Sequence, residues 1–183
     1  MKQTIVLLLV FHLLIGCAVA QKVFISKSSE VSFYSVAPIE NIDAHNSSMS
    51  SILNTNTNEL AFIVPIRNFR FKKALMQEHF NEKYLESDKF PQATFQGKIL
   101  GTVPYTQDGS YPVAVEGKLT IHGVTRDIHE NGTIRVSGNE IKAESEFRVA
   151  VANYKISIPQ LLFENIADTV TVKLNVVYKP YEK

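Results

Sequence analysis

Apolar residues recur at every second position through most of the chain, and this alternation is the feature that most constrains the fold. The clearest example spans residues 169–178, where Val and Leu alternate with Thr, Lys and Asn. Successive side chains of a strand point to opposite faces of a sheet, so a period of two predicts a strand with one buried face. The same pattern predicts further strands over residues 29–36, 42–48, 60–66, 93–99, 113–121, 134–136 and 141–149.

Turn-forming residues separate these runs. Asn, Asp and Gly favour turns because they tolerate left-handed backbone angles or bond to their own backbone. The sequence predicts turns at the polar cluster 54–58 and at the pairs Asp108-Gly109, Asn131-Gly132 and Gly138-Asn139.

One segment between the strands has helical character. Residues 72–85 lack Gly, Pro and β-branched side chains and are rich in Leu, Met, Gln, Glu and Lys, which predicts a helix. Phe90-Pro91 is expected to end this helix, because the residue before a proline avoids helical angles. A second, shorter helical turn is predicted over residues 159–165. Apolar side chains lie near one face of the main helix at Leu75, Met76, Phe80 and Tyr84.

The pattern predicts an all-β, antiparallel fold, since most strands follow one another without a helical crossover. Alternation alone does not separate a sandwich from a barrel, but three features favour a barrel. Several strands have about nine to eleven residues, which suits tilted staves. Gly97 and Gly117 fall on apolar faces, where a strand must bend or leave room. The single helix could cap one end. Such a barrel could be filled by its own side chains or could hold one small ligand.

The N-terminus has the pattern of a signal peptide. A short head with Lys2 precedes an almost wholly apolar run over residues 5–16, which is too short to span a bilayer comfortably. Ala18-Val19-Ala20 fits signal peptidase cleavage, so we expect residues 1–20 to be removed and 21–183 to form one domain in the periplasm. The alternative is a lipobox ending at Cys17, which would anchor the protein by lipidation.

Charge and cysteine content limit the partners of the domain. The chain has 19 basic and 18 acidic residues, and one of the basic ones, Lys2, lies in the signal peptide. A neutral domain argues against a nucleic-acid partner, which would favour a basic field. The single cysteine, Cys17, also lies in the signal peptide, so burial must stabilise the domain without disulfides. The oligomeric state is left open, a dimer included.

No motif for catalysis or metal binding is recognisable. The sequence contains neither G-x-S-x-G nor H-E-x-x-H, and we expect neither enzymatic activity nor a metal or cofactor. His122 is expected to face solvent beside the inward Leu119 and Ile121. Glu144 and Glu146 are expected on a solvated outer face.

Three stretches resemble the YceI-like family. They are residues 59–71, the His-containing helix with Phe90-Pro91 and Phe95 after it, and residues 117–125, which are similar to the family pattern G-x-L-T-x-x-G-x-T. Phe147 and the final alternating strand also fit. The resemblance implies an exported, lipocalin-like, up-and-down barrel of eight strands with one inserted helix that caps it. It also implies that a polyisoprenoid, an isoprenoid quinone or a fatty-acyl lipid occupies an apolar tunnel.

The alternation then selects the residues that would line the tunnel. A cavity of several hundred Å³ would favour lipid binding, whereas a filled core would favour an exported structural or adhesion module. The basic and aromatic residues 67–73 could give the barrel mouth a membrane-facing or headgroup-contacting role. Residues at the mouth or lid would be Phe71, Leu75, His79, Phe80 and Tyr84. The expected wall residues are Phe33, Phe62, Val64, Phe95, Val115, Leu119, Phe147, Val172 and Leu174.

Overall fold

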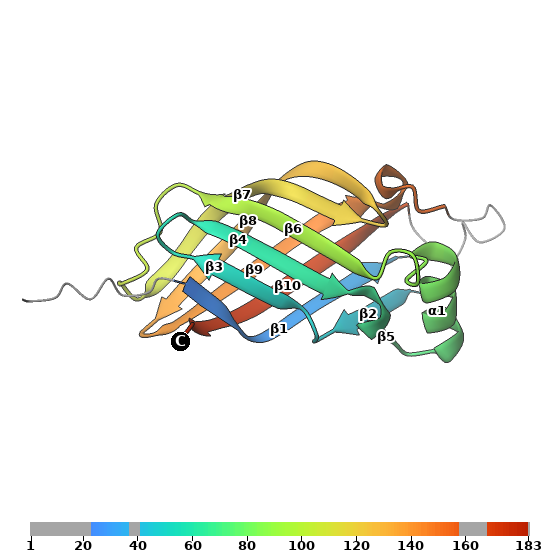
Figure 1. Cartoon of the computed structure of the whole chain (residues 1–183), viewed down its shortest axis with the longest axis horizontal. Coiled ribbons are helices and arrows are strands. Elements are labelled where there is room, and N and C mark those ends of the chain that lie inside the picture. Colours follow the sequence, from blue (N-terminus) through green and yellow to red (C-terminus); the bar gives the residue numbers. More distant parts are fainter. Residues whose placement is uncertain (1–22, 37–40, 158–167, 183) are drawn as a thin grey trace, which may run out of the picture.

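The protein is a closed antiparallel β-barrel with a helix at one end (Figure 1). The computed structural model describes residues 23–36, 41–157 and 168–182. The strands are β1 Val23–Ser35, β2 Ile42–Asn46, β3 Ser50–Asn54, β4 Glu59–Pro65, β5 Arg70–Phe71, β6 Gln92–Leu100, β7 Gly109–Ile121, β8 Val124–Ser137, β9 Glu140–Ala150 and β10 Thr169–Pro180. The helical segments are η1 Ile66–Asn68, α1 Ala74–His79, η2 Phe80–Tyr84 and η3 Val151–Tyr154.

The strands form eight staves in sequence order, as predicted for an up-and-down barrel. β1 pairs with β3 near its start and with β2 near its end, so β2 and β3 act as one interrupted stave. β4 and β5 form the next interrupted stave, because β4 pairs with β3 and β5 pairs with β2. β10 pairs with β1 over most of their length and closes the ring. Closure pairs β1 with β10, so the first and last strands are not left as free sheet edges.

Asn46 holds the two interrupted staves together. Its side chain is 1% exposed, and its Nδ2 donates a hydrogen bond of 2.7 Å to the carbonyl oxygen of Pro65. Its Oδ1 accepts a hydrogen bond of 2.7 Å from the backbone NH of Ser48. A buried side-chain amide therefore takes the place of ladder hydrogen bonds where the strands break.

Gly97 and Gly117 allow two strands to pack under an aromatic ring. They lie directly opposite each other in the β6–β7 register. A Cβ atom on Gly97 would lie 2.5 Å from the ring of Phe95, and one on Gly117 would lie 2.7 Å from it. Both would also meet backbone oxygens at 2.1 and 2.4 Å. The structure thus confirms that these glycines leave room on the apolar face.

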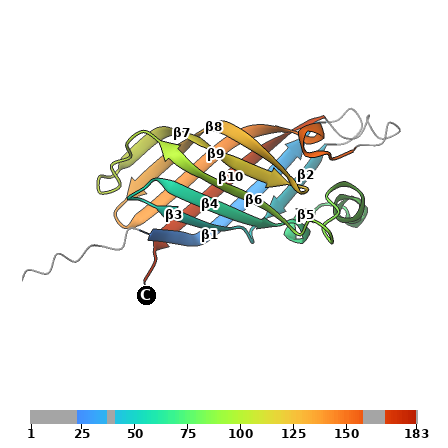
Figure 2. The same cartoon turned by 45° about the horizontal axis from the view of Figure 1, so that its top comes forward.

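The predicted helix over residues 72–85 is confirmed, with a change of type along it. α1 continues directly into the π-helical η2, and both cover one end of the barrel (Figure 2). The backbone NH of Leu85 bonds to the carbonyl oxygen of Phe80, which ends the π-helical turn. The helical turn predicted at 159–165, the signal peptide and Cys17 lie outside the described residues.

The predictions around β8 were wrong. Asn131-Gly132 is not a turn but lies inside β8, a strand of 14 residues that includes the supposedly short strand 134–136. The turn lies instead at His122 and Gly123, whose φ angles are 50° and 71°. Positive φ at both central positions suits the twist of a β-hairpin.

Two other turn predictions had different outcomes. Gly138-Asn139 does form the β8–β9 turn, with Gly138 at a φ of 54°. Asp108-Gly109 does not, because Gly109 already begins β7. Asp108 ends a longer loop, where its carboxylate accepts a hydrogen bond from the backbone NH of Gly138. β3 was not predicted at all.

Candidate functional site

The barrel encloses a cavity of about 490 Å³. Its wall is formed mainly by Val, Ile, Leu and Phe side chains from the inward positions of β1, β4 and β6–β10 and from the helix end. Leu53, Ile141, Val176 and Tyr178 do not belong to this wall, so the cavity lies toward the helix end of the barrel. A largely apolar cavity of this size can hold an apolar small molecule.

Period-two alternation located the wall residues correctly. Every residue expected to line the interior lies on the cavity wall in the structure. That these side chains contact a ligand stays a prediction. The residues are Phe33, Phe62, Val64, Phe95, Val115, Leu119, Phe147, Val172 and Leu174.

Aromatic side chains join the helix to the barrel. The ring of Phe80 stacks on that of Phe33, with centroids 5.5 Å apart. It also contacts Phe71 at 4.9 Å and Phe69 at 5.4 Å. Because Phe33, Phe69, Phe71 and Phe80 also line the cavity, the contacts that hold the helix in place are part of the cavity wall.

The expected lid residues are mostly placed at this end. Phe71, His79, Phe80 and Tyr84 line the cavity. Leu75 does not: its side chain is 59% exposed, and the neighbouring Met76 faces the cavity instead. Leu75 thus lies on the outer face of the helix, and its role at the mouth stays a prediction.

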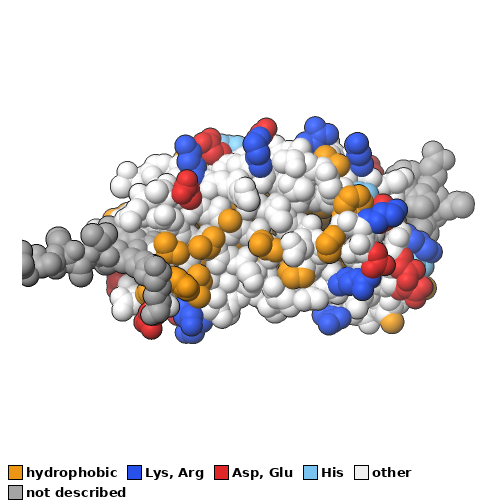
Figure 3. Space-filling model, in the orientation of Figure 1, with side chains coloured by type: hydrophobic (Ala, Val, Ile, Leu, Met, Phe, Trp, Pro, Cys, Tyr) orange, Lys and Arg blue, Asp and Glu red, His pale blue; other side chains and the backbone are white. Residues whose placement is uncertain are grey.

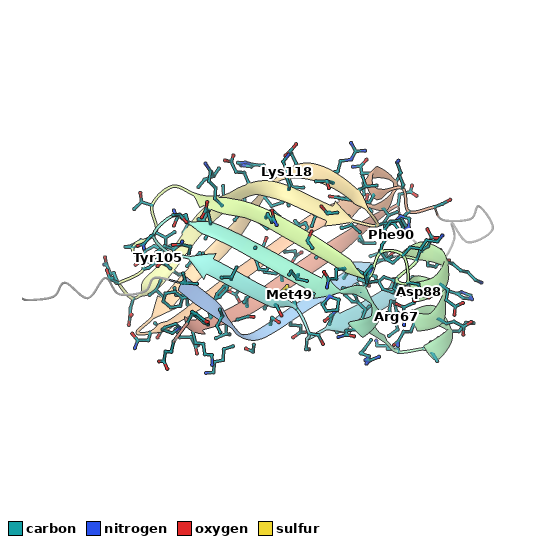
Figure 4. The ribbon with its side chains drawn as sticks, in the orientation of Figure 1. Met49, Arg67, Asp88, Phe90, Tyr105 and Lys118 are labelled. Atoms are coloured by element: carbon teal, nitrogen blue, oxygen red, sulfur yellow. The ribbon has the colours of Figure 1, made fainter. Side chains whose placement is uncertain are left out.

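The end away from the helix is filled. Tyr178 is fully buried there, and its hydroxyl lies 2.6 Å from the Ser51 hydroxyl. Ser51 donates its own proton to the carbonyl oxygen of Ala61 at 3.0 Å, so Tyr178 must donate to Ser51. Burial raises the pKa of Tyr178 and also raises that of Tyr105 to about 12. Figure 4 shows Tyr105 at this end, far from the helix.

His122 connects the β7–β8 turn to the segment after the helix. The prediction that it faces solvent was wrong, since its side chain is 10% exposed. Its Nε2 lies 3.0 Å from Glu86 Oε2, and its Nδ1 lies 3.2 Å from the carbonyl oxygen of Tyr154. The ring of Phe90 packs edge-on against it at 4.5 Å. Lys89, followed by His122, lowers the pKa of Glu86.

Other charged groups are paired with one another, including Glu144, which also lies against the cavity. Glu144 forms ion pairs with Lys142 and Arg135, and Lys142 has the larger effect in lowering its pKa. Glu146 pairs with Lys173 on the outer surface. Among the described residues, no three or more His, Cys, Asp or Glu side chains could hold a metal ion together. None of the helices described there is long and apolar enough to cross a membrane.

The sequence analysis missed several polar wall residues, and Glu130 is the charged one without an ion pair within the described ranges. Glu130 lines the cavity from β8, where it pairs in register with the inward-facing Val115 of β7. Glu130 was missed because the turn wrongly predicted at Asn131-Gly132 divided β8, so Glu130 was not assigned to a strand. The positions Ile128, Glu130, Gly132 and Ile134 continue one alternating face through the supposed turn, and this was the signal available.

Comparison with solved structures shows the same fold in distant proteins. A polyisoprenoid-binding domain from Saccharophagus degradans, implicated in plant cell wall breakdown, has a TM-score of 0.74 at 15% identity, covering 86% of this chain and 98% of its own. BcnA of Burkholderia cenocepacia has a TM-score of 0.70 at 16% identity, covering 81% and 95%. The YceI protein of Campylobacter jejuni has a TM-score of 0.65 at 16% identity, covering 79% and 88%.

Comparison at the level of sequence gives the family. No curated protein matches the chain significantly. The YceI-like domain, however, matches residues 23–178, which span the barrel from its first strand to Tyr178 of its last. The chain therefore belongs to the YceI-like family.

Proposed function

We propose that this protein binds a long-chain apolar lipid of the polyisoprenoid type inside its barrel, as an exported periplasmic protein. The observation that carries the proposal is the cavity of about 490 Å³ with an almost wholly apolar wall. The similar fold of a polyisoprenoid-binding domain from Saccharophagus degradans supports the class of ligand.

The chemistry of the wall favours a hydrocarbon ligand. Burying each CH₂ group of a lipid contributes about 0.8 kcal/mol. Polar wall groups would oppose this, because each loses water and needs a partner. Most of the wall consists of side chains such as Val115, Leu119, Phe147 and Val172, which require no such partner.

The helix end is the proposed entrance. The cavity extends beneath the helix, where Met76, His79 and Phe80 form part of its wall. Outside it, Leu75 and the cationic side chains of Arg70 and Lys72 are exposed. Figure 3 shows both signs of charge around this end of the molecule. An exposed leucine beside cations supports transient contact with an anionic membrane surface, from which a lipid could enter.

Binding is favoured over catalysis by the partners of three histidines. His45 contacts Glu30 and Asp43, and His79 accepts a hydrogen bond from Lys83. His122 contacts Glu86 and a backbone oxygen. These contacts do not include a serine or threonine hydroxyl that could act as a nucleophile. The cavity likewise favours lipid binding over a structural module with a filled core.

A chain-length series tests lipid binding directly. The purified protein, stripped of lipid, is titrated with isoprenoid alcohols of three, four, six and eight isoprene units. We expect saturable binding near one per chain. Its affinity should rise with length until the chain no longer fits, because each added unit buries more hydrocarbon. Absence of saturable binding at every length would contradict the proposal.

Export is tested separately by mass spectrometry of the protein recovered from cell fractions. A mature N-terminus at Gln21 in the periplasm would agree with the proposal. A lipidated N-terminus at Cys17, lost in a Cys17→Ser variant, would show the anchored form instead. A full-length chain in the cytoplasm would contradict export.

A further inference from the structure

Glu130 places a carboxylate on the cavity wall without a partner for it. In the described part of the chain, no hydrogen bond or ion pair joins Glu130 to another residue. The other carboxylates nearby differ. Glu144, which also lies against the cavity, pairs with Arg135 and Lys142, and Glu146 pairs with Lys173. Glu130 thus combines a place on the cavity wall with the lack of a neutralising group, whereas Glu144 at the same cavity is neutralised.

Glu130 also lies where the barrel wall opens. The β8–β9 ladder runs from Ser137↔Glu140 to Gly132↔Ser145 and stops there. β7 continues to pair with β8 as far as Val124, and β9 continues to pair with β10 as far as Ala150. Glu130 is therefore the first inward residue of β8 beyond the end of the ladder.

The 3₁₀ helix η3 contacts both strands beyond this point. Arg126 Nε donates to the carbonyl oxygen of Asn153 at 3.1 Å, so this guanidinium binds η3 rather than Glu130. At the end of the ladder, the Ser145 hydroxyl donates to the carbonyl oxygen of Asn131 at 2.7 Å. The polar groups around the opening are thus engaged with the backbone.

The surroundings leave the carboxylate short of donors. Burial raises the pKa of Glu130, and the neighbouring His129 only partly opposes this. The charge of Glu130 in turn adds to the burial that raises the pKa of Tyr154. The wall residues on either side, such as Val115 and Ile128, offer no donor. A half-buried carboxylate of this kind is stabilised by any hydrogen-bond donor that a ligand supplies.

We propose that Glu130 is the polar anchor of the lipid site, where its carboxylate accepts a hydrogen bond from a hydroxyl, amide or ammonium group of the bound lipid. The hydrocarbon part of the ligand then occupies the apolar remainder of the cavity. This inference rests on the proposed function and narrows it to lipids with a hydrogen-bond donor. Carboxylic acids and phosphate esters are disfavoured at this position because two like charges repel at short range.

The test compares two probes that differ in one donor: geranylgeraniol and geranylgeranyl methyl ether. Affinities are measured by calorimetry on the purified, lipid-free protein and on three variants. The wild-type protein should prefer the alcohol by about tenfold, since hydrogen bonds to charged groups are among the stronger ones. Glu130→Gln, which keeps an acceptor, should retain a few-fold preference, and Glu130→Leu should lose it. Glu146→Gln on the outer face is the matched control and should behave as the wild type.

The outcomes separate this inference from the proposed function. If the wild-type protein binds both probes equally, or if Glu130→Leu keeps the preference, the anchor is wrong while lipid binding stands. If neither probe binds to the wild-type protein, the proposed function fails and the anchor fails with it. Urea unfolding of each variant checks that lost affinity does not reflect lost structure.

Discussion

The two ends of the barrel share one side-chain pattern but differ in packing. Away from the helix, four side chains are at most 1% exposed and belong to the hydrophobic core. They are Leu53, Ile141, Val176 and Tyr178. Toward the helix, inward residues such as Leu119 and Val172 are only partly buried, because they face the cavity. Both ends result from period-two alternation on neighbouring staves.

The difference shows that alternation determines which face of the sheet a side chain points to, but not whether side chains fill the interior of the barrel. At the end away from the helix, which we call the closed end, the loop between β6 and β7 contributes the buried Val103. The Tyr178–Ser51 hydroxyl pair joins two staves there. At the helix end, which we call the open end, the corresponding volume is the cavity. The helix covers it, and the ring of Phe80 packs on that of Phe33. We therefore expect the closed end to provide stability and the open end to provide binding.

Leucine truncation should give the largest difference between the ends. Leu53→Ala should lower the free energy of unfolding by about 3 to 5 kcal/mol, because it creates a void in a filled region. Leu119→Ala should cost about 1 to 2 kcal/mol, because part of its side chain already faces empty space. Urea denaturation measures both. Equal losses would mean that the two ends do not differ in packing.

Tryptophan insertion should affect the two ends in opposite ways. Val172→Trp should fill part of the cavity and weaken binding of a long isoprenoid alcohol by a hundredfold or more, with the fold retained. Val176→Trp, at a site with no exposed surface, should instead lower the free energy of unfolding by about 1 to 3 kcal/mol through overpacking. Calorimetric titration and urea denaturation distinguish the two effects. Undiminished lipid binding by Val172→Trp would place the ligand elsewhere.

Removal of one hydroxyl tests the polar contact at the closed end. Tyr178→Phe should lower the free energy of unfolding by about 1 kcal/mol, since Ser51 loses a donor in a buried setting. Tyr111→Phe is the control, because the hydroxyl of Tyr111 donates to Gln107 in an exposed position and should matter less. A larger effect at Tyr111 would contradict the role given to the buried pair.

Acid should loosen the helix end before the closed end. The pKa of Glu86 is lowered by Lys89 and His122, so its stabilising contribution is present above the ordinary carboxyl pKa of 4.5. That contribution is lost as the pH falls through the lower value in the folded protein. Amide hydrogen exchange of residues 85–90 should lose protection over this range, while that of β3 should not. Glu86→Gln should remove the pH dependence, and an unchanged profile in that variant would show that Glu86 is not its cause.

The cavity wall could be predicted from the sequence because a strand fixes the direction of each side chain. Once Val172 points inward, Val170 and Leu174 must do so as well. The closed, sequential order of the strands was also predictable, since no helical crossover separates most of them and the resemblance to the YceI-like family implied a barrel.

The remaining errors have physical causes. β3 is rich in Ser and Asn, and its burial depends on partners such as Tyr178 that lie far away in sequence. Glu130 and Gly132 interrupt the apolar face of β8, so local composition suggested a turn where long-range pairing imposes a strand. His122 was misplaced because its burial depends on Glu86 and Tyr154, which belong to other segments.

The central claim is that the open end of the barrel is a lipid site. The most direct test is native mass spectrometry of the protein, purified gently from its own cell envelope. We predict a co-purifying species near one per chain, which organic extraction identifies as a long-chain isoprenoid. The same species should be absent from Val172→Trp. A protein that carries no lipid from the envelope and takes up none when long-chain isoprenoids are added would contradict the account.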